Sequence, residues 1–191
     1  MKKILGLILA GALLATGLFA QGEGTLNTVA SVDLDRYKGK WFEIARYPNK
    51  FQKKCVGNTT ATYTIESDGD IEVLNECLKK NGKTDRAKGE ARIVDESTNA
   101  KLEVRFAPAF LSFLPFVWGD YWVIDLADDY SYAVVGDPKR EYLWILSRTP
   151  ELETSVYQGI LRRVEEKGFD PGKLVETPQN VEVLKGQVIG E

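Results

Sequence analysis

A row of short alternating segments between residues 41 and 147 limits the fold of this chain more than any other feature. Apolar and polar residues alternate there with a period of two in eight runs, which is the pattern of half-buried strands. The links carry turn residues such as Asp68-Gly69 and Asn81-Gly82, which favour hairpins. Sequential antiparallel strands of this kind form a sandwich or a barrel. We predict strands over residues 41–47, 58–66, 71–77, 88–94, 101–106, 120–126, 130–136 and 142–147.

One amphipathic helix is predicted after the strands. Thr154 or Ser155 is expected to cap its N-terminus and Gly168 its C-terminus. Its apolar stripe is expected to pack against the outside of the sheet, and consists of Val156, Ile160, Leu161 and Val164. Residues 173–176 are a candidate for one more strand. Eight strands close an up-and-down barrel with room for one small ligand. The predicted fold is therefore all-β: an eight-stranded antiparallel up-and-down barrel with one helix outside.

The first 20 residues have the pattern of a secretory signal peptide. Two lysines precede an uncharged apolar run over residues 4–20, as in exported proteins. A retained transmembrane anchor is the alternative, because the run is near the lower length limit for a membrane span. Residues 21–32 are predicted to be a flexible leader, residues 33–180 the barrel and helix, and residues 181–191 a tail without assigned structure.

The chain contains two cysteines and no histidine. The lack of histidine excludes Ser-His-Asp and Cys-His catalysis and histidine metal sites, and no metal or other cofactor is expected. Cys55 and Cys77 are expected to form a disulfide in an oxidising compartment, with two free buried thiols as the alternative. The net charge of −3 makes nucleic acid a poor partner.

Two segments resemble the sequence motifs of the lipocalin family. Residues 39–46, Gly-Lys-Trp-Phe-Glu-Ile-Ala-Arg, resemble its G-x-W entry motif. Residues 136–150, which end in Ser-Arg-Thr-Pro, resemble its second and third motifs joined together. A single G-x-W is weak evidence, but both segments at this spacing, with a helix after them, are specific. The resemblance covers about residues 31–180 and is to the bacterial branch, which includes outer-membrane lipocalin and is similar to apolipoprotein D.

This resemblance implies a calyx, closed at one end and open at the other, that binds a small amphiphile such as a fatty acid or lysophospholipid. Its implied role is lipid storage, transport or membrane maintenance in the cell envelope, without catalysis. A lipid isomerase or esterase on the same scaffold is the alternative, and it would need a free, activated thiol. Residues 1–54 contain no cysteine for lipid attachment. The implied protein is therefore exported to the bacterial periplasm or cell envelope without an N-terminal lipid, as a monomer or homodimer.

The resemblance also implies structural roles at the two ends of the barrel. Trp41 on the first strand and Arg148 after the eighth are expected to meet at the closed end as a cation–π pair. Because strand directions alternate, Cys55 and Cys77 fall on the same rim of the open end, where a disulfide is geometrically possible.

In such a barrel, strand parity predicts the inward-facing side chains of six strands. Both faces of the sixth and seventh strands are apolar, and there the resemblance implies that Tyr121, Val123 and Asp125, then Ala133 and Val135, face inward. Glu43, Ala45 and Asp125 are expected to face inward, with a structural partner such as Arg148 for the buried carboxylates. The side chains predicted to contact the ligand are Tyr47, Ala61, Tyr63, Val73, Asn75, Ala91, Val104, Phe106, Tyr121, Val123, Val135, Tyr142 and Trp144.

The loop over residues 107–119 contains more large apolar residues than a solvated loop needs. Two interpretations remain open: a lid folded over the open end, or a surface that contacts a membrane or partner. The residues expected to make such a membrane contact are Phe110, Phe113, Phe116 and Trp118. A neighbouring lysine cluster is either solvated or attracts an anionic head group; it consists of Lys50, Lys53 and Lys54.

Overall fold

The computed structural model describes residues 24–67, 69–184 and 187–189. The predicted signal segment over residues 1–20 lies outside the described residues. Within the described part of the chain, no helix has the length and apolar character needed to cross a membrane.

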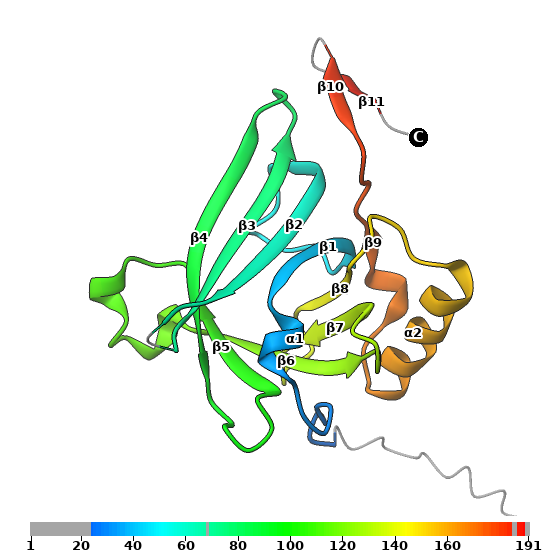
Figure 1. The fold of residues 1–191 in the computed structure, drawn as a ribbon. Helices are drawn as coiled ribbons and strands as arrows, with labels where there is room; N and C mark the ends of the chain where they lie inside the picture. The colour runs from blue at the N-terminus through cyan, green and yellow to red at the C-terminus, as the bar shows by residue number, and fades with distance from the viewer. Residues whose placement is uncertain (1–23, 68, 185–186, 190–191) are drawn as a thin grey trace, which may run out of the picture.

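Eight antiparallel strands form a closed barrel (Figure 1). From β2 to β8 each strand pairs with the next one in sequence, and β1 closes the ring by pairing with both β8 and β2. The predicted fold is confirmed. The strands are β1 Gly39–Arg46, β2 Cys55–Ile65, β3 Ile71–Lys79, β4 Thr84–Ile93, β5 Lys101–Arg105, β6 Gly119–Leu126, β7 Tyr132–Gly136 and β8 Leu143–Ser147.

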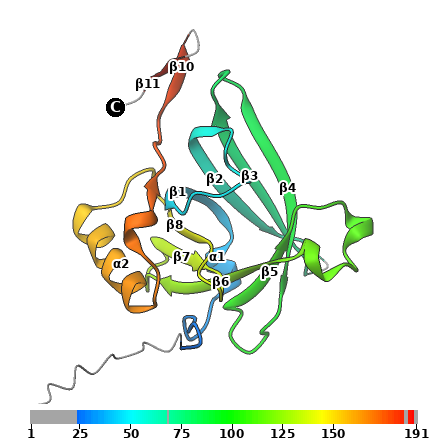
Figure 2. The same ribbon diagram turned by 180° about the vertical axis from the view of Figure 1, so that it is seen from behind.

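The barrel wall is uneven in height. β4 begins at Thr84, four residues earlier than predicted, and pairs with β3 from there to Ala91. Only the last part of β4, from Glu90 to Ile93, pairs with the short strand β5. Strands β2, β3 and β4 consequently rise beyond the rest of the barrel at its open end (Figures 1 and 2). The mouth therefore has one tall wall, made by these three strands, and one low wall.

The helix α2 (Thr154–Glu166) packs on the outside of the barrel, as predicted. Its apolar stripe completes an outer hydrophobic cluster with strands β6, β7 and β8. Glu153 occupies the N-cap position and no side chain caps this end, so the predicted capping by Thr154 or Ser155 is wrong. Because the helix already begins at Thr154, both hydroxyl residues lie within its first turn rather than at the N-cap position.

The C-terminus of α2 has the predicted glycine cap. Gly168 has a φ of +84°, a conformation that glycine adopts without steric cost. The N–H groups of Gly168 and Phe169 donate to the carbonyls of Glu165 and Val164, which is the Schellman arrangement. Phe169 also packs with Val164 in the outer cluster.

Two β-bulges decide which side chains face the interior. The register shifts in β1 between Glu43 and Ala45, and in β6 between Val123 and Asp125. Each bulge adds one residue, so the alternation of inward and outward side chains reverses beyond it. For this reason the predicted inward orientation of Ala45 and Asp125 is wrong. Ala45 lies in the outer cluster, and Asp125 pairs with Arg163 of α2 at 2.8 Å.

The segment before β1 is bound to the barrel. The N–H of Val29 donates to the carbonyl of Val123, and the N–H of Val32 to that of Thr98. Leu26 and Val32 are buried. The short helix α1 (Leu34–Tyr37) follows, capped by the Asp33 carboxylate. The prediction of a flexible leader is therefore wrong for residues 24–32, because its few apolar side chains find places in the hydrophobic clusters.

The chain after α2 returns to the barrel. A 3₁₀ turn, η3 (Pro171–Lys173), leads into β9 (Val175–Glu176), which pairs with the open-end half of β1. The candidate strand over residues 173–176 is thus present in its second half. β10 (Glu182–Leu184) and β11 (Gln187–Ile189) then form a hairpin, which the sequence pattern does not predict.

Residues 177–181 lie where β1 and β2 part. β1 pairs with β2 only from Gly39 to Phe42. Beyond that point the Gln179 amide donates to the carbonyls of Glu43 and Thr59, one on each strand. The Asn58 side chain bonds both the carbonyl and the N–H of Val181. We call residues 177–181 the seam segment, since they join β1 to β2 in the upper wall.

Candidate ligand-binding site

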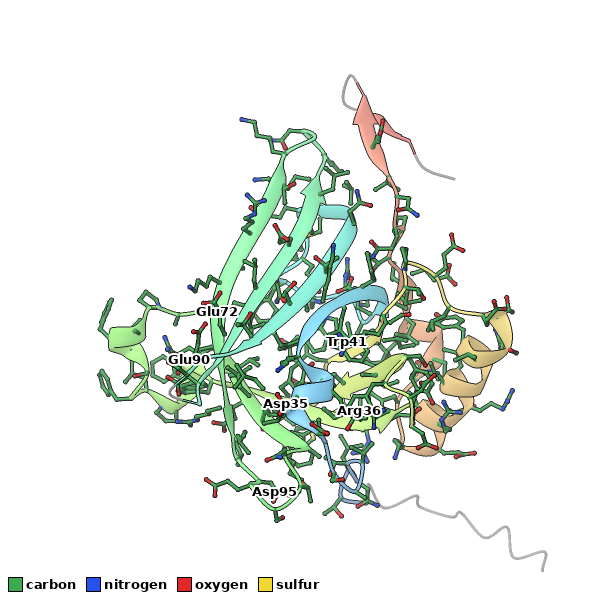
Figure 3. All side chains as sticks on the ribbon, viewed as in Figure 1. Asp35, Arg36, Trp41, Glu72, Glu90 and Asp95 are labelled. Carbon is green, nitrogen blue, oxygen red and sulfur yellow. A yellow bond between two sulfur atoms is a disulfide. The ribbon has the colours of Figure 1, made fainter. Side chains whose placement is uncertain are left out.

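The closed end is sealed by the predicted pair of Trp41 and Arg148. The guanidinium carbon of Arg148 lies 3.7 Å from the centre of the Trp41 ring, and the indole N–H donates to the carbonyl of Tyr37. Arg148 also donates to the carbonyls of Arg36, Tyr37 and Lys40, which ties α1 to the barrel. Figure 3 labels Arg36 on α1 and Trp41 on β1. Gly39 of the G-x-W segment has a φ of +92°, so the glycine there is conformationally required.

Most of the predicted ligand-contacting side chains share the inner hydrophobic cluster. Seven of them belong to it, and two more, Val104 and Trp144, pack against it. Asn75 lies opposite Ala61 in the β2–β3 register and is half-buried. The nine are Ala61, Tyr63, Val73, Ala91, Val104, Tyr121, Val123, Val135 and Trp144.

Tyr47 does not face the interior, contrary to the prediction. It follows the β1 bulge and packs in the outer cluster against Phe169, with ring centres 6.1 Å apart. Its hydroxyl donates to the carbonyl of Asp170 and accepts from the Asp170 N–H. Tyr47 therefore fixes the chain after α2.

Three tyrosine hydroxyls form a chain near the closed end. The Tyr121 hydroxyl oxygen lies 2.7 Å from those of both Tyr37 and Tyr63. Burial raises the pKa of Tyr63 to about 12, and it also raises the pKa values of Tyr37 and Tyr121 well above the usual 10. All three groups therefore remain protonated hydrogen-bond donors at physiological pH.

The tyrosine chain borders a small cavity of about 20 Å³. Apart from the three tyrosine side chains and Lys38, its lining is aliphatic, from α1, the segment before it and strands β2 to β6. This volume holds roughly one water molecule. The closed half of the barrel is thus largely filled by its own side chains, which leaves no space there for a larger molecule.

An aromatic ladder leads from solvent into the open half. Phe51 is 62% exposed, and its ring centre lies 6.0 Å from that of Tyr142. Tyr142 stacks on Trp144 with ring centres 5.7 Å apart and planes 5° apart. Trp144 in turn packs against the inner cluster. The predicted ligand contacts Tyr142 and Trp144 thus line one path from the mouth to the interior.

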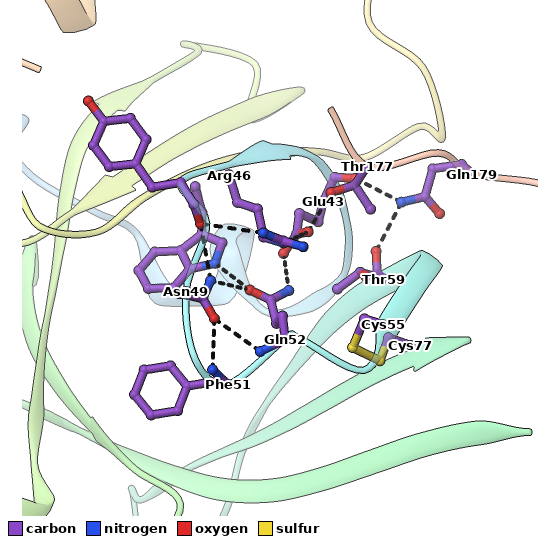
Figure 4. Close-up of polar contacts among 12 residues, drawn as sticks. Glu43, Arg46, Asn49, Phe51, Gln52, Cys55, Thr59, Cys77, Thr177 and Gln179 are labelled. Carbon is purple, nitrogen blue, oxygen red and sulfur yellow. Dashed lines mark hydrogen bonds and ion pairs between the residues drawn. A yellow bond between two sulfur atoms is a disulfide. The ribbon is translucent and has the colours of Figure 1, made fainter. Parts of the chain in front are cut away.

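A polar network supports this ladder from one side (Figure 4). The Gln52 amide oxygen accepts from the Trp144 indole at 3.2 Å and from Asn49 at 2.7 Å. The Gln52 amide nitrogen donates to Glu43 at 2.6 Å. Gln52 therefore fixes Trp144 relative to β1.

Glu43 is a buried carboxylate with a different partner from the one predicted. It is 3% exposed and forms an ion pair with Arg46 at 3.2 Å rather than with Arg148. Thr177 of the seam segment also donates to it. Burial raises the pKa of Glu43, and the hydrogen bonds from Thr177 and Gln52 and the charge of Arg46 oppose this rise.

The predicted disulfide joins the rims of β2 and β3. Cys55 and Cys77 are bonded, with Cα atoms 5.6 Å apart. The chain has no other cysteine, so no thiol remains for the enzymatic alternative in this state. Lys54 on the same rim pairs with Asp85 at 2.7 Å, and Lys50 lies over the Phe51 ring.

The aromatic loop after β5 does not cover the mouth. It forms two 3₁₀ turns, η1 (Ala109–Leu111) and η2 (Pro115–Val117), and stands beside β4 on the outside of the barrel (Figures 1 and 2). Phe110, Phe113 and Phe116 are 74–79% exposed, so the lid interpretation is wrong here. Predicted ligand contact Phe106, at the start of the loop, is 43% exposed.

Trp118 anchors this loop instead of facing outward with the phenylalanines. Its ring centre lies 4.1 Å from the guanidinium carbon of Arg92 and 5.1 Å from that of Arg105. Its indole N–H donates to the carbonyl of Ser112. Arg105 is itself buried and paired with Glu90 at 2.6 Å. The loop therefore presents its phenylalanines from a fixed base.

Several residues of the site escape sequence analysis. Tyr37 lies in a four-residue helix, too short to show a helical period. Gln52 and Arg46 belong to the polar network. Gln52 lies in the loop before β2, and Arg46 follows the bulge in β1, so neither is part of a regular alternation. The exposed Phe51 is the one detectable signal, as an aromatic residue among the rim lysines.

The described residues contain no group of three His, Cys, Asp or Glu side chains placed to hold a metal ion. The site instead combines an apolar inner face, an aromatic entrance and a few fixed polar groups. Such a combination suits a small apolar or amphiphilic molecule.

Comparison with known proteins agrees with this geometry. Residues 32–179 match the family model described as a lipocalin-like domain. Temperature-induced lipocalin-1 of Arabidopsis thaliana is 45% identical over 81% of this chain and 83% of its own. The outer membrane lipoprotein Blc of Vibrio cholerae is 37% identical over 81% of this chain and 87% of its own. Mouse apolipoprotein D is a further relative.

A solved structure shares the fold at low sequence identity. Insecticyanin of the tobacco hornworm Manduca sexta superposes with a TM-score of 0.62 at 22% identity, over 80% of this chain and 83% of its own. With the family model covering most of the chain and two relatives above 30% identity, this chain belongs to the lipocalin family.

Proposed function

We propose that this lipocalin binds a long-chain amphiphile, such as a fatty acid or lysophospholipid, with its apolar chain in the barrel and its polar head at the mouth. The observation that carries the proposal is the aromatic ladder of Phe51, Tyr142 and Trp144, which runs from solvent to an apolar inner face. Flat aromatic faces next to aliphatic side chains suit a flexible acyl chain. The exposed lysines Lys50 and Lys53 on the same rim suit an anionic head group.

The matching role is storage or transport of lipid in a bacterial envelope. Relatives named as outer membrane lipoproteins support an envelope location, and the apolar start of the sequence supports export. Residues 1–54 offer no cysteine for lipid attachment, which supports a form without an N-terminal lipid. Its contact with a membrane is then reversible and made by the fixed, exposed phenylalanines of the aromatic loop.

Native mass spectrometry before and after delipidation tests the binding proposal. We expect a co-purified lipid mass that is lost on delipidation and restored by hexadecanoic acid or a lysophospholipid. Ala61→Phe fills the inner face and should reduce binding at least tenfold. Thr62→Phe, at the next residue of β2 on the opposite face, is the matched control and should bind like the wild type. Loss of binding in both variants, or no binding in the wild type, contradicts the proposal.

Vesicle flotation tests the membrane contact. Replacing Phe110, Phe113 and Phe116 together with serine should abolish binding to vesicles of anionic phospholipid, because it removes three exposed apolar side chains. Val94→Ser, which alters another exposed apolar side chain, is the control and should leave flotation unchanged. Equal flotation of the triple variant and the wild type contradicts the proposed contact.

A further inference from the structure

The links between the strands carry opposite charges at the two ends of the barrel. The three links at the closed end contain seven acidic residues and no basic one; they are residues 66–70, 94–100 and 127–131. At the open end, residues 47–54 and 80–83 contain five lysines and no acidic residue. The chain is therefore polarised along the barrel axis, although its net charge is only −3. We call these five lysines the lysine rim: Lys50, Lys53, Lys54, Lys80 and Lys83.

The two links of the lysine rim lie side by side. Cys55, which follows the first link, is paired with Lys79, which precedes the second. Asp85 joins the two segments, because its carboxylate contacts Lys54 at 2.7 Å and Lys79 at 3.1 Å. The second link is the tip of the tall wall formed by β2, β3 and β4 (Figure 2). The rim therefore projects beyond the low wall of the mouth.

Much of the rim's charge has no partner within the described part of the molecule. On the outside of the tall wall, in contrast, Arg86 pairs with Glu76 at 2.6 Å. Among the ion pairs that residues 24–67 and 69–184 form, none includes Lys53, Lys80 or Lys83. All three side chains are exposed. Their charges are therefore available to an anion outside the protein.

An extended anionic surface fits this rim better than a single small ion. The lysines are distributed over two links, so they present several charges side by side. Phe51 lies among them and is 62% exposed. The uncharged link over residues 107–118 adds its exposed phenylalanines at the same end of the barrel. Cationic and exposed aromatic side chains together are typical of surfaces that bind at the boundary between anionic lipid and water.

We propose that the lysine rim docks the protein, mouth first, on an anionic lipid bilayer. The same bilayer repels the acidic closed end, so the separation of charge decides which end approaches it. In this orientation Phe51, the outer end of the aromatic ladder, faces the lipid. An amphiphile then passes between bilayer and barrel without crossing open water. The inference rests on the proposed function, because it is the exchange of a lipid that requires the mouth to face the membrane.

Binding to vesicles of two surface charges tests the docking. The probes are vesicles of phosphatidylcholine alone and of phosphatidylcholine and phosphatidylglycerol in equal parts, each in low and in high salt. The test variant carries Lys80→Gln and Lys83→Gln. The control carries Lys40→Gln and Arg162→Gln, two exposed cations away from the open end, and has the same net charge. The measured quantity is the partition coefficient of each protein.

We expect the wild type to prefer the anionic vesicles in low salt and to lose this preference in high salt. Each lysine near an anionic surface contributes about fivefold to binding, so the test variant should bind the anionic vesicles about twentyfold more weakly. The control should bind like the wild type. Equal binding of the wild type and the test variant, or equal losses in the test variant and the control, overturns the docking.

Native mass spectrometry of the same proteins separates this proposal from the proposed function. The test variant should take up hexadecanoic acid like the wild type, because neither Lys80 nor Lys83 belongs to the proposed ligand site. A wild type that docks on anionic vesicles but takes up no lipid contradicts the proposed function and not the rim. A wild type that takes up lipid but binds both kinds of vesicle equally overturns the rim alone.

Discussion

Tyr121 is the central member of the chain of three tyrosine hydroxyls, and Tyr37 and Tyr63 are its ends. Deleting the Tyr121 hydroxyl should destabilise the fold more than deleting that of Tyr63. Tyr63→Phe removes one hydrogen bond and leaves Tyr37 and Tyr121 bonded to each other, so it should cost about 1 kcal/mol. Tyr121→Phe leaves the buried hydroxyls of Tyr37 and Tyr63 without their shared partner. At about 1–3 kcal/mol for each unpaired buried group, the loss is about 2–6 kcal/mol. A water molecule in the adjoining cavity brings it toward the lower value.

A variant with Tyr37→Phe, Tyr63→Phe and Tyr121→Phe together gives a second test of the tyrosine chain. It removes every member of the chain and keeps the three rings, so no hydroxyl is left buried without a partner. Replacing all partners by apolar groups of the same shape is nearly neutral. The triple variant should therefore be more stable than Tyr121→Phe alone, although it carries two more substitutions.

Equilibrium urea unfolding of the oxidised protein measures these differences as shifts in the midpoint at constant slope. The order of stability should be wild type, Tyr63→Phe, Tyr121→Phe, with the triple variant above Tyr121→Phe. If Tyr121→Phe is no less stable than Tyr63→Phe, or the triple variant is the least stable of all, the hydroxyls do not form one chain and the reasoning is refuted.

Three further predictions concern the ends of the barrel and the buried carboxylate. Replacing Cys55 and Cys77 with serine should lower the free energy of unfolding by about 3 kcal/mol in the loop-entropy model; an unchanged urea midpoint contradicts this. Arg148→Ala removes three bonds to carbonyls and the contact with Trp41, and should cost about 2–4 kcal/mol. Arg148→Lys should restore part of that loss, and equal stability of the two variants would sink the assignment. Burial raises the folded-state pKa of Glu43 above 4.5, so the folded chain binds this proton more tightly and wild-type stability falls as pH rises from about 4.5 through that pKa. Glu43→Gln does not titrate, so its stability relative to wild type should rise with pH over that interval, and a flat difference contradicts the shift.

Sequence analysis predicts the barrel because every strand leaves a signal in the chain. The alternation of apolar and polar residues marks each strand, and glycine-containing turns separate several of them. The resemblance to the lipocalin motifs implies the Trp41–Arg148 pair, because it identifies the closed end of the barrel. With that end identified, the alternating strand directions place Cys55 and Cys77 on one rim.

The bulges are not predictable in this way. At Ile44 and Ala45, and again at Val123 and Ile124, neighbouring positions are both apolar, so the pattern does not show which residue faces inward. One extra residue then moves Tyr47 from the expected inner face to the outer cluster. The sequence pattern does not predict the partners of Glu43 either. Gln52 and Thr177 come from irregular segments whose paths depend on tertiary contacts.

The seam segment has a consequence for the order in which the molecule is made. Residues 177–181 join β1 to β2 in the upper wall, yet the ribosome adds them after all eight barrel strands and the helix α2. Strands β2 and β3, with the bridge that joins them, are complete much earlier and can pair as soon as both are synthesised. The wall beside Glu43, in contrast, stays open until the segment after α2 has been synthesised. β1 and β2 therefore remain unjoined above Phe42 while every other neighbouring pair of barrel strands can already be in place.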